Sequence, residues 1–211
     1  MGIQGRWVNL RPVLPDDTRL LFGWRADAST LQMLHGNRRM PPFDEFRAEL
    51  ENILRTTNTL IAEDSASRRA IGYVQGYNAN MADGWVLFLA YFSSPYQNKP
   101  HGAEATLLFL NYLFDHFPFR KVYAEVFEYN PQVCKMLERG GFKEEGRAKE
   151  HTFFQDRFWD LINYALWRED WYQLRNRFRF LLDVENDARE LLVDKARTGL
   201  LKGNGDGHSQ R

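Results

Sequence analysis

The loop of residues 93–101 joins a predicted strand, Trp85–Phe92, to the strongest predicted helix, Gly102–Phe117, and it holds the residues best suited to chemistry. Backbone N–H groups converge at the start of a helix, and the helix dipole favours an anion such as phosphate there. The loop is therefore a candidate phosphate site. A plain strand-to-helix turn explains the same pattern equally well when the loop is taken alone.

Hydrophobic periodicity predicts the elements that must position this loop. Polar links at 64–69 and 78–84 separate three consecutive strands, which indicates an antiparallel meander in a mixed α/β fold and excludes a purely parallel Rossmann sheet. Asn130 and Pro131 predict a helix start, because an Asn side chain caps a free N–H and proline fits the first turn. The expected strands are 6–11, 59–63, 70–77, 85–92, 121–127, 142–150 and 157–167, and the expected helices are a short one around 20–24, then 43–55, 102–117, 131–139 with a glycine stop at Gly140–Gly141, and one from Glu169 toward Lys195.

Composition narrows the class of protein. The 28 Lys and Arg residues balance the 28 Asp and Glu residues, which argues against a nucleic-acid coat protein or a polybasic membrane binder. One cysteine excludes an internal disulfide, and the histidines lack metal-ligand spacing, so we expect no metal. The sequence has no long apolar run and no secretory signal, so we expect no membrane span and a cytoplasmic location.

Four further stretches form an ordered set along the chain. They are Trp7–Pro12 with Asp16 and Asp17, Glu104–Ala105, Asn130 with Leu137–Gly146, and Asp160 with Tyr164–Trp171. Each is weak alone, and together they span roughly Trp7 to Trp171. With these stretches the chain resembles the GNAT acetyltransferase superfamily, in its ribosomal-protein-acetyltransferase-like branch of the RimJ/RimL type.

The resemblance implies a GNAT fold over residues 1–171, a central mixed and mainly antiparallel sheet with helices on both faces. A helical extension over 172–201 and a disordered tail over 202–211 follow. The implied activity is acyl transfer, above all of acetyl, from acyl-CoA to a primary amine by direct attack. The acceptor is either a small amine such as an amino sugar or a protein N-terminus, and a homodimer is a further option.

The resemblance also assigns roles to residues. The pyrophosphate of CoA would lie on the loop from Gln97 to Ala103, and the pantetheine would pair with the diverging strand segment Ala90–Ser93. A backbone N–H near Phe92 would polarise the thioester oxygen, and such a donor needs little reorganisation. The implied cofactor-binding residues are Ala90, Ser93, Gln97, Asn98, Lys99, His101, Gly102, Ala103 and Asn130, and the implied catalytic residues are Phe92, Tyr91, Asn130 and Cys134.

Three positions depart from the family pattern. Pro100 stands where the loop pattern has its first glycine, and proline offers no N–H to a phosphate. Lys99 and His101 could offset this loss through their side chains. Leu137 replaces a tyrosine general acid, and Val133 replaces the serine that ribosomal-protein-type members use.

The sequence therefore does not identify the general acid or the general base. Cys134 is a candidate, although a lone cysteine on a helix is most simply core filling. The candidates from elsewhere are Glu63, His35, Tyr91 and His151, while Asp160 is interpreted as structural. A second hypothesis follows from the departures, a GNAT-fold module that binds acyl-CoA or a partner protein without turnover.

Two aromatic-rich patches are interpreted as core and sheet packing, with an acceptor pocket or a dimer seam as the alternative. They are Phe153–Phe154 with Phe158–Trp159, and Trp167 with Trp171–Tyr172. The extension beyond them carries leucines at helical spacing, and it either packs on its own domain, contacts a second subunit or covers the acceptor site.

Overall fold

The computed structural model describes residues 2–27, 30, 39–97 and 99–178. An eight-stranded sheet has the order β1-β2-β3-β4-β5-β6-β8-β7, and within it only β5 and β6 run parallel. The strands are β1 Ile3–Gln4, β2 Val8–Pro12, β3 Asn58–Asp64, β4 Ala70–Asn80, β5 Trp85–Phe92, β6 Lys121–Phe127, β7 Lys143–Phe154 and β8 Arg157–Trp167. The α-helices are α1 Thr18–Ala26, α3 Phe43–Thr56, α4 Pro100–His116, α5 Pro131–Arg139 and α6 Arg168–Leu174.

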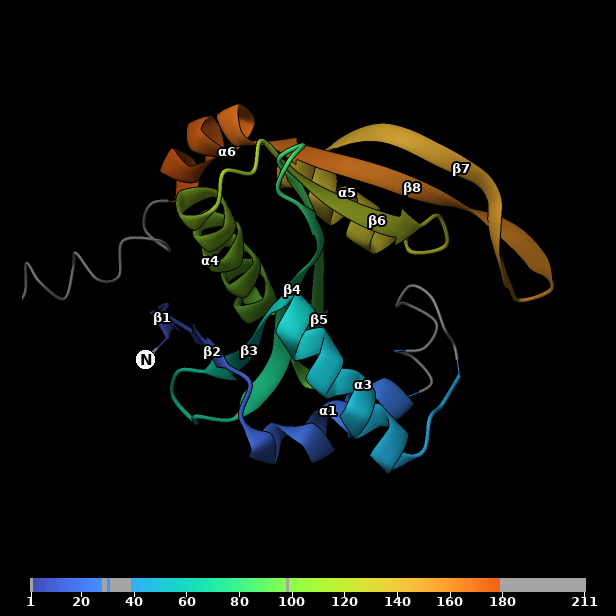
Figure 1. The fold of residues 1–211 in the computed structure, drawn as a ribbon. Coiled ribbons are helices and arrows are strands. Elements are labelled where there is room, and N and C mark those ends of the chain that lie inside the picture. The colour runs from blue at the N-terminus through green and yellow to red at the C-terminus, as the bar shows by residue number, and fades with distance from the viewer. Residues whose placement is uncertain (1, 28–29, 31–38, 98, 179–211) are drawn as a thin grey trace, which may run out of the picture.

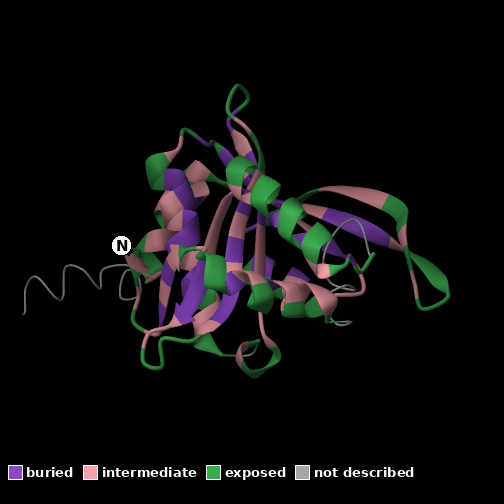
Figure 2. Cartoon of the chain, turned by 60° about the horizontal axis from the view of Figure 1, so that its bottom comes forward, coloured by how far each residue is buried: buried purple, intermediate pink, exposed green. Residues whose placement is uncertain are grey.

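The helices cover both faces of the sheet, as expected (Figure 1). Leu108, Phe109 and Leu113 of α4 are buried against the inward-facing residues of the central strands. A second core joins α1 and α3 to the opposite face, where Phe46 and Leu50 are buried with Ile61. Figure 2 shows the resulting distribution, with buried residues along the central strands and the inner side of α4. The predicted meander β3–β4–β5 is confirmed.

Several predicted boundaries are corrected, and one strand was not predicted. Helix α4 begins at Pro100 and not at Gly102, because proline fits the first helical position and Lys99 precedes it in an extended conformation. A short strand, β1, precedes the predicted first strand. The β7–β8 hairpin reaches Phe154, beyond the expected end at 150.

The first aromatic patch, at the tip of the β7–β8 hairpin, does not lie in the core as predicted. Phe153 and Phe158 are 51% and 60% exposed, and they contact each other at the tip of the projecting hairpin rather than in the core. In the second patch the core interpretation is confirmed for Trp171, which is 1% exposed and stacks on Phe114. The core interpretation is therefore wrong for the hairpin tip.

Helix α5 ends where the glycines predicted. Gly140 follows its last residue, and Gly141 has φ +87°, a left-handed conformation that glycine adopts without strain. A Cβ atom on Gly141 would clash with Leu174 Cδ1, so the glycine also lets α6 pack closely against this turn. Beyond α6, a short 3₁₀ turn covers Arg175–Phe178, and the rest of the predicted extension and the tail lie outside the described residues.

Glu104 joins the N-terminal segment to the first turn of α4. Its carboxylate is fully buried and accepts the backbone N–H groups of Arg6, Trp7 and Val8 at 2.7, 2.7 and 2.9 Å. A buried carboxylate is tolerated only when hydrogen bonds satisfy it, and these three bonds do so. Glu104 thereby positions the N-terminal part of α4 against the segment that leads into β2.

Candidate active site

Strands β5 and β6 separate after a short stretch of pairing. Their parallel ladder covers only Trp85–Leu87 against Lys121–Tyr123. Beyond it β5 stays paired with β4 as far as Phe92, while β6 pairs with β8 as far as Phe127. We call the space between 88–92 of β5 and 124–127 of β6 the strand gap. Within the described part of the chain, no strand pairs with this edge of β5.

The backbone of β5 turns two N–H groups into the strand gap. In an antiparallel ladder, residues alternate between those that bond to the partner strand and those whose N–H and C=O point away. Ser93 donates its N–H to Ile71 C=O at 2.9 Å, so Tyr91 also bonds toward β4. The N–H groups of Ala90 and Phe92 therefore face the strand gap, the geometry that an added extended ligand needs.

The start of α4 adjoins this edge. Pro100 occupies the first helical position, so it removes one amide donor but leaves the helix geometry intact. The next amides, those of His101 and Gly102, have no acceptor inside the helix and stay available to an anion. A Cβ atom on Gly102 would lie 3.2 Å from the Phe92 ring, so a larger residue would crowd this corner.

The polar side chains of the loop are held by the protein. His101 Nε2 lies 3.0 Å from Asp64 Oδ2, and Lys99 Nζ lies 4.7 Å from the centre of the Tyr96 ring. A hydrogen bond from Ser67 is the main cause that lowers the pKa of Asp64. Gln97 donates its Nε2 to Phe92 C=O at 3.2 Å. Backbone amides are therefore the groups best placed for a phosphate, and Asn98 lies outside the described residues.

An aromatic cluster lines the sheet face beside Tyr91. The Tyr91 ring lies 5.5 Å from Tyr73 and 5.4 Å from Trp24, measured between ring centres. Burial raises the pKa of both tyrosines. Each phenol therefore stays protonated at neutral pH, so Tyr91 is unsuited to act as a base.

The residues expected on α5 take mostly structural positions. Asn130 precedes the helix as predicted, but its side chain makes no cap hydrogen bond, and its backbone C=O accepts the N–H groups of Val133 and Cys134 at 3.2 Å each. Cys134 and Leu137 are buried in the main core, and burial raises the pKa of the Cys134 thiol. A thiolate is disfavoured there, so packing explains Cys134 better than catalysis.

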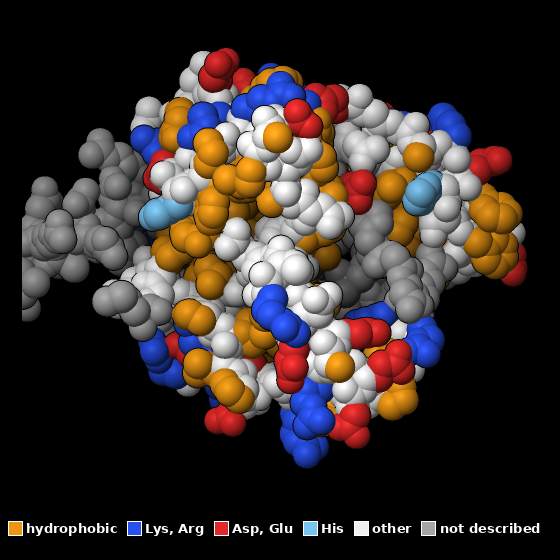
Figure 3. Space-filling view, viewed as in Figure 1, with side chains coloured by type: hydrophobic (Ala, Val, Ile, Leu, Met, Phe, Trp, Pro, Cys, Tyr) orange, Lys and Arg blue, Asp and Glu red, His pale blue; other side chains and the backbone are white. Residues whose placement is uncertain are grey.

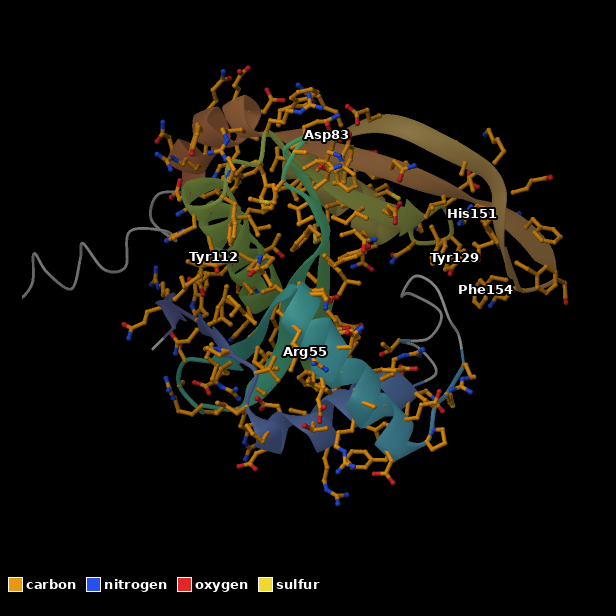
Figure 4. The ribbon with its side chains drawn as sticks, viewed as in Figure 1. Arg55, Asp83, Tyr112, Tyr129, His151 and Phe154 are labelled. Atoms are coloured by element: carbon orange, nitrogen blue, oxygen red, sulfur yellow. The ribbon has the colours of Figure 1, made fainter. Side chains whose placement is uncertain are left out.

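The other candidate bases are occupied or remote. Glu63 is buried and its carboxylate contacts Arg11 at 2.9 Å and Arg68 at 3.0 Å. His151 is exposed on the hairpin, where Figure 4 places it above Tyr129 and Phe154, and His35 lies outside the described residues. Asp160 is structural, since it accepts Lys149 Nζ at 2.7 Å, and this contact is the main cause that lowers its pKa to about 2.

The sheet face that carries the aromatic cluster also has a cavity of about 340 Å³, which the sequence did not predict. Its carboxylates come from strands far apart in the chain, so no local spacing pointed to it. The lining residues are Trp85, Leu87, Tyr123, Glu125, Glu145, Gly146 and Asn163.

Two kinds of feature are absent from the described residues. These residues contain no cluster of His, Cys, Asp and Glu able to hold a metal ion. Within the same part of the chain, no helix combines the length and apolar character that crossing a membrane requires.

Known proteins share this architecture. Among solved structures the chain is similar to a spermidine N-acetyltransferase from Vibrio cholerae in complex with CoA and spermine, with a TM-score of 0.73 and 20% identity over 79% of this chain and 98% of that chain. It is also similar to a GCN5-related N-acetyltransferase from Brucella melitensis, with a TM-score of 0.71 and 23% identity over 88% of this chain and 87% of that one. At these identities the likeness concerns the fold.

Sequence comparison identifies the family. The chain is 24% identical over 169 residues to the SPbeta prophage-derived uncharacterized N-acetyltransferase YokL of Bacillus subtilis, which covers 79% of this chain and 93% of the relative. Residues 8–143, more than half of the chain, match the acetyltransferase (GNAT) domain family. The chain therefore belongs to the GNAT acetyltransferases, and it transfers an acetyl group from acetyl-CoA to an amine.

Proposed function

We propose that the acceptor is the primary amine of a small aliphatic molecule, and that this amine attacks the thioester directly at the strand gap. The amine nitrogen forms the new bond to the carbonyl carbon, the C–S bond breaks, and CoA leaves as the thiol after it takes up the proton that the amine loses. The observation that carries this proposal is the free edge of β5, where the N–H groups of Ala90 and Phe92 face the strand gap.

The chain's own groups divide the work of binding and catalysis. The exposed edge of β5 suits the amides of pantetheine, and the amides of His101 and Gly102 suit the pyrophosphate. Acetyl-CoA supplies the activated acyl group when it is bound. The Phe92 N–H stabilises the charge that develops on the thioester oxygen, which a preorganised backbone donor does without reorganisation.

The aromatic cluster supports the nucleophile. Trp24, Tyr73 and Tyr91 form a partly dry wall next to the strand gap. Removal of water disfavours a charged ammonium, so the cluster favours the neutral amine that can attack. Tyr91, through its protonated hydroxyl, orients the amine. With this arrangement no carboxylate or histidine base is required.

Two acceptor classes compete. The likeness to the RimJ/RimL type favours a protein N-terminus, whereas the similar Vibrio cholerae enzyme was crystallised with spermine. We favour a small amine, because the aromatic cluster and the cavity lie on one sheet face where a slender chain fits. We further propose that the protein acts in the reducing cytoplasm, where its single cysteine stays a thiol.

One pair of variants tests the catalytic role of the strand edge. Phe92→Pro removes the N–H that faces the strand gap, and proline is tolerated at an unpaired strand edge. We expect its kcat to fall by about a hundredfold or more, the usual effect of losing one such donor. Phe92→Ala removes the same ring but keeps the N–H, and its kcat should stay within about tenfold of the wild type.

The assay measures CoA release from acetyl-CoA with spermidine, an amino sugar and a short peptide that has a free N-terminus. Preferential turnover of the small amines supports the proposed acceptor class. Preferential turnover of the peptide would assign the acceptor to the RimJ/RimL type. Equal kcat for Phe92→Pro and Phe92→Ala would show that the Phe92 amide has no role in the chemical step.

A further inference from the structure

The side chain of His101, the second residue of α4, is held by the turn between β3 and β4. Its Nε2 lies 3.0 Å from Oδ2 of Asp64, the last residue of β3, and the two side chains are only 15% and 14% exposed. The Tyr96 ring meets the imidazole edge to face, with ring centres 5.3 Å apart. A hydrogen bond and a ring contact therefore fix His101 against two segments that precede α4 in the chain.

The carboxylate of Asp64 determines the direction of this hydrogen bond. Ser67 donates its N–H and its hydroxyl to Asp64 Oδ1 at 2.7 and 2.6 Å, and these bonds are the main cause that lowers the pKa of Asp64. An ionised carboxylate only accepts hydrogen bonds, so His101 Nε2 is the donor. Nδ1 of the same ring is buried and has no partner within the described residues. In this arrangement the ring therefore offers neither nitrogen to a phosphate.

The turn that carries Asp64 is anchored to the same segment as Glu104. Ser65 donates its N–H to Trp7 C=O at 2.9 Å, and Trp7 donates its own N–H to the Glu104 carboxylate. His101 and Glu104 are three residues apart, so they lie on one face of α4. Together they attach this face to one corner of the sheet, with His101 nearest to the end of the helix.

His101 also supplies one of the free backbone amides at the start of α4. Lys99 precedes the helix without a side-chain cap, and Pro100 has no N–H, so the amides of His101 and Gly102 are the first donors. Helix α4 contains no Lys or Arg, and Figure 3 shows mainly hydrophobic and uncharged side chains over it. Binding of an anion at this end therefore depends on where the two amides point.

We propose that His101 is a positioning residue for the acetyl donor: its bond to Asp64 holds the first turn of α4 so that the amides of His101 and Gly102 meet the diphosphate of acetyl-CoA. The inference rests on the placement of the diphosphate in the proposed function and adds the contact that fixes it. Hydrogen bonds weaken steeply when their angle is distorted. Because Pro100 has already removed one donor, a small rotation of this turn weakens all that remain.

Calorimetry with CoA measures the effect without any amine. His101→Ala should raise the Kd of CoA about tenfold, the factor expected when one charge-assisted contact is lost. His101→Gln keeps an N–H donor near the position of Nε2, and its Kd should return to within about threefold of the wild type. His116→Ala makes the same change at the exposed last residue of α4 and should leave the Kd unchanged. Equal Kd values for His101→Ala and the wild type, or for His101→Gln and His101→Ala, would overturn the proposal.

A double-variant cycle tests whether the two side chains act through one contact. Asp64→Ala should also raise the Kd of CoA. The variant that carries both His101→Ala and Asp64→Ala should bind no more weakly than the weaker single variant, because both substitutions remove the same bond. Additive losses would show that the two residues act separately and would overturn the proposal.

A donor without the diphosphate separates positioning from general damage to the fold. S-acetylpantetheine carries the thioester arm alone, and the acceptor is whichever amine of the three above is turned over fastest. His101→Ala should lower kcat/KM for acetyl-CoA about tenfold through KM, and should leave kcat/KM for S-acetylpantetheine within about twofold of the wild type. An equal loss with both donors would contradict a role at the diphosphate.

The outcomes also separate this inference from the proposed function. If Gly102→Val weakens CoA binding and His101→Ala does not, the diphosphate site stands and the positioning role is wrong. If the peptide is acetylated in preference to the small amines, the proposed acceptor is wrong, while the calorimetry, which contains no amine, still decides about His101.

Discussion

Replacement of Glu104 by alanine tests whether one buried carboxylate positions the start of α4. The side chain is fully buried and accepts three backbone N–H groups of the N-terminal segment. In Glu104→Ala all three bonds are lost at once. Water replaces the lost acceptor at Arg6 and Trp7, which are not fully buried, whereas the Val8 amide stays buried without a partner.

The magnitude follows from these contacts. A hydrogen bond to a charged group contributes about 1.5–3 kcal/mol, and three bonds that share one carboxylate do not add in full. We therefore expect Glu104→Ala to lower the free energy of unfolding by about 3–5 kcal/mol. Glu104→Gln keeps the shape and one accepting oxygen, and its loss should be smaller, about 2 kcal/mol.

Urea unfolding followed by tryptophan fluorescence measures this effect. With a denaturant dependence of about 2 kcal/mol per molar, the midpoint of Glu104→Ala should fall by roughly 2 M. Glu49→Ala, at an exposed position on α3, is the matched control and should change stability by less than about 0.5 kcal/mol. If Glu104→Ala unfolds at the wild-type urea concentration, the carboxylate does not anchor the N-terminal segment.

Three further predictions concern the site and its supports. Gly102→Val should weaken acetyl-CoA binding about tenfold or more, because the added side chain crowds the Phe92 ring beside the amides of His101 and Gly102. Calorimetry measures this affinity, and a wild-type value would contradict the phosphate site. Asp160→Asn should lose stability at neutral pH, and the gap to wild type should close in acid. Asp160 has a pKa lowered to about 2, so its contribution is complete above the ordinary value of 3.8 and is lost as pH falls through 2; urea midpoints that differ equally at all pH values would refute this. Gly141→Ala should cost about 2 kcal/mol in urea unfolding, because φ is +87° and the added Cβ meets a packed side chain; an unchanged midpoint would refute the close packing at this turn.

The departures from the family pattern have local explanations. Pro100 is the first residue of α4, where it removes one amide donor but suits the helix. Leu137 is buried in the core, so an apolar packing residue occupies the position where the family pattern has a tyrosine general acid. Tyr91 of β5 is a protonated phenol on the sheet face where we propose that the amine binds, and it contacts Trp24 of α1. In the proposed reaction the leaving thiolate therefore takes its proton from the amine or from water.

Much of the fold was predictable because its signals are local. Alternating apolar residues marked β3, β4 and β5, and the glycines after Arg139 marked the end of α5, since only backbone conformation and one-face burial are involved. The loop before α4 was equally visible as a candidate phosphate site. The error at its start arose because proline was interpreted as a departure from the loop pattern instead of as the first residue of the helix.

Most of the order of elements was predictable from the sequence, because periodicity and turn residues are local signals. The resemblance to the GNAT family came from short stretches in a fixed order, and the thioester site at the edge of β5 stays a prediction that follows from this resemblance. Which side chains meet depends on the tertiary structure. Strand pairing places Glu125 of β6 and Glu145 of β7 around one cavity beside Trp85, and it joins Glu104 to the amides of the N-terminal segment. It also buries Cys134 and leaves Phe158 exposed. These outcomes depend on contacts between residues distant in the chain, and no local spacing encodes them.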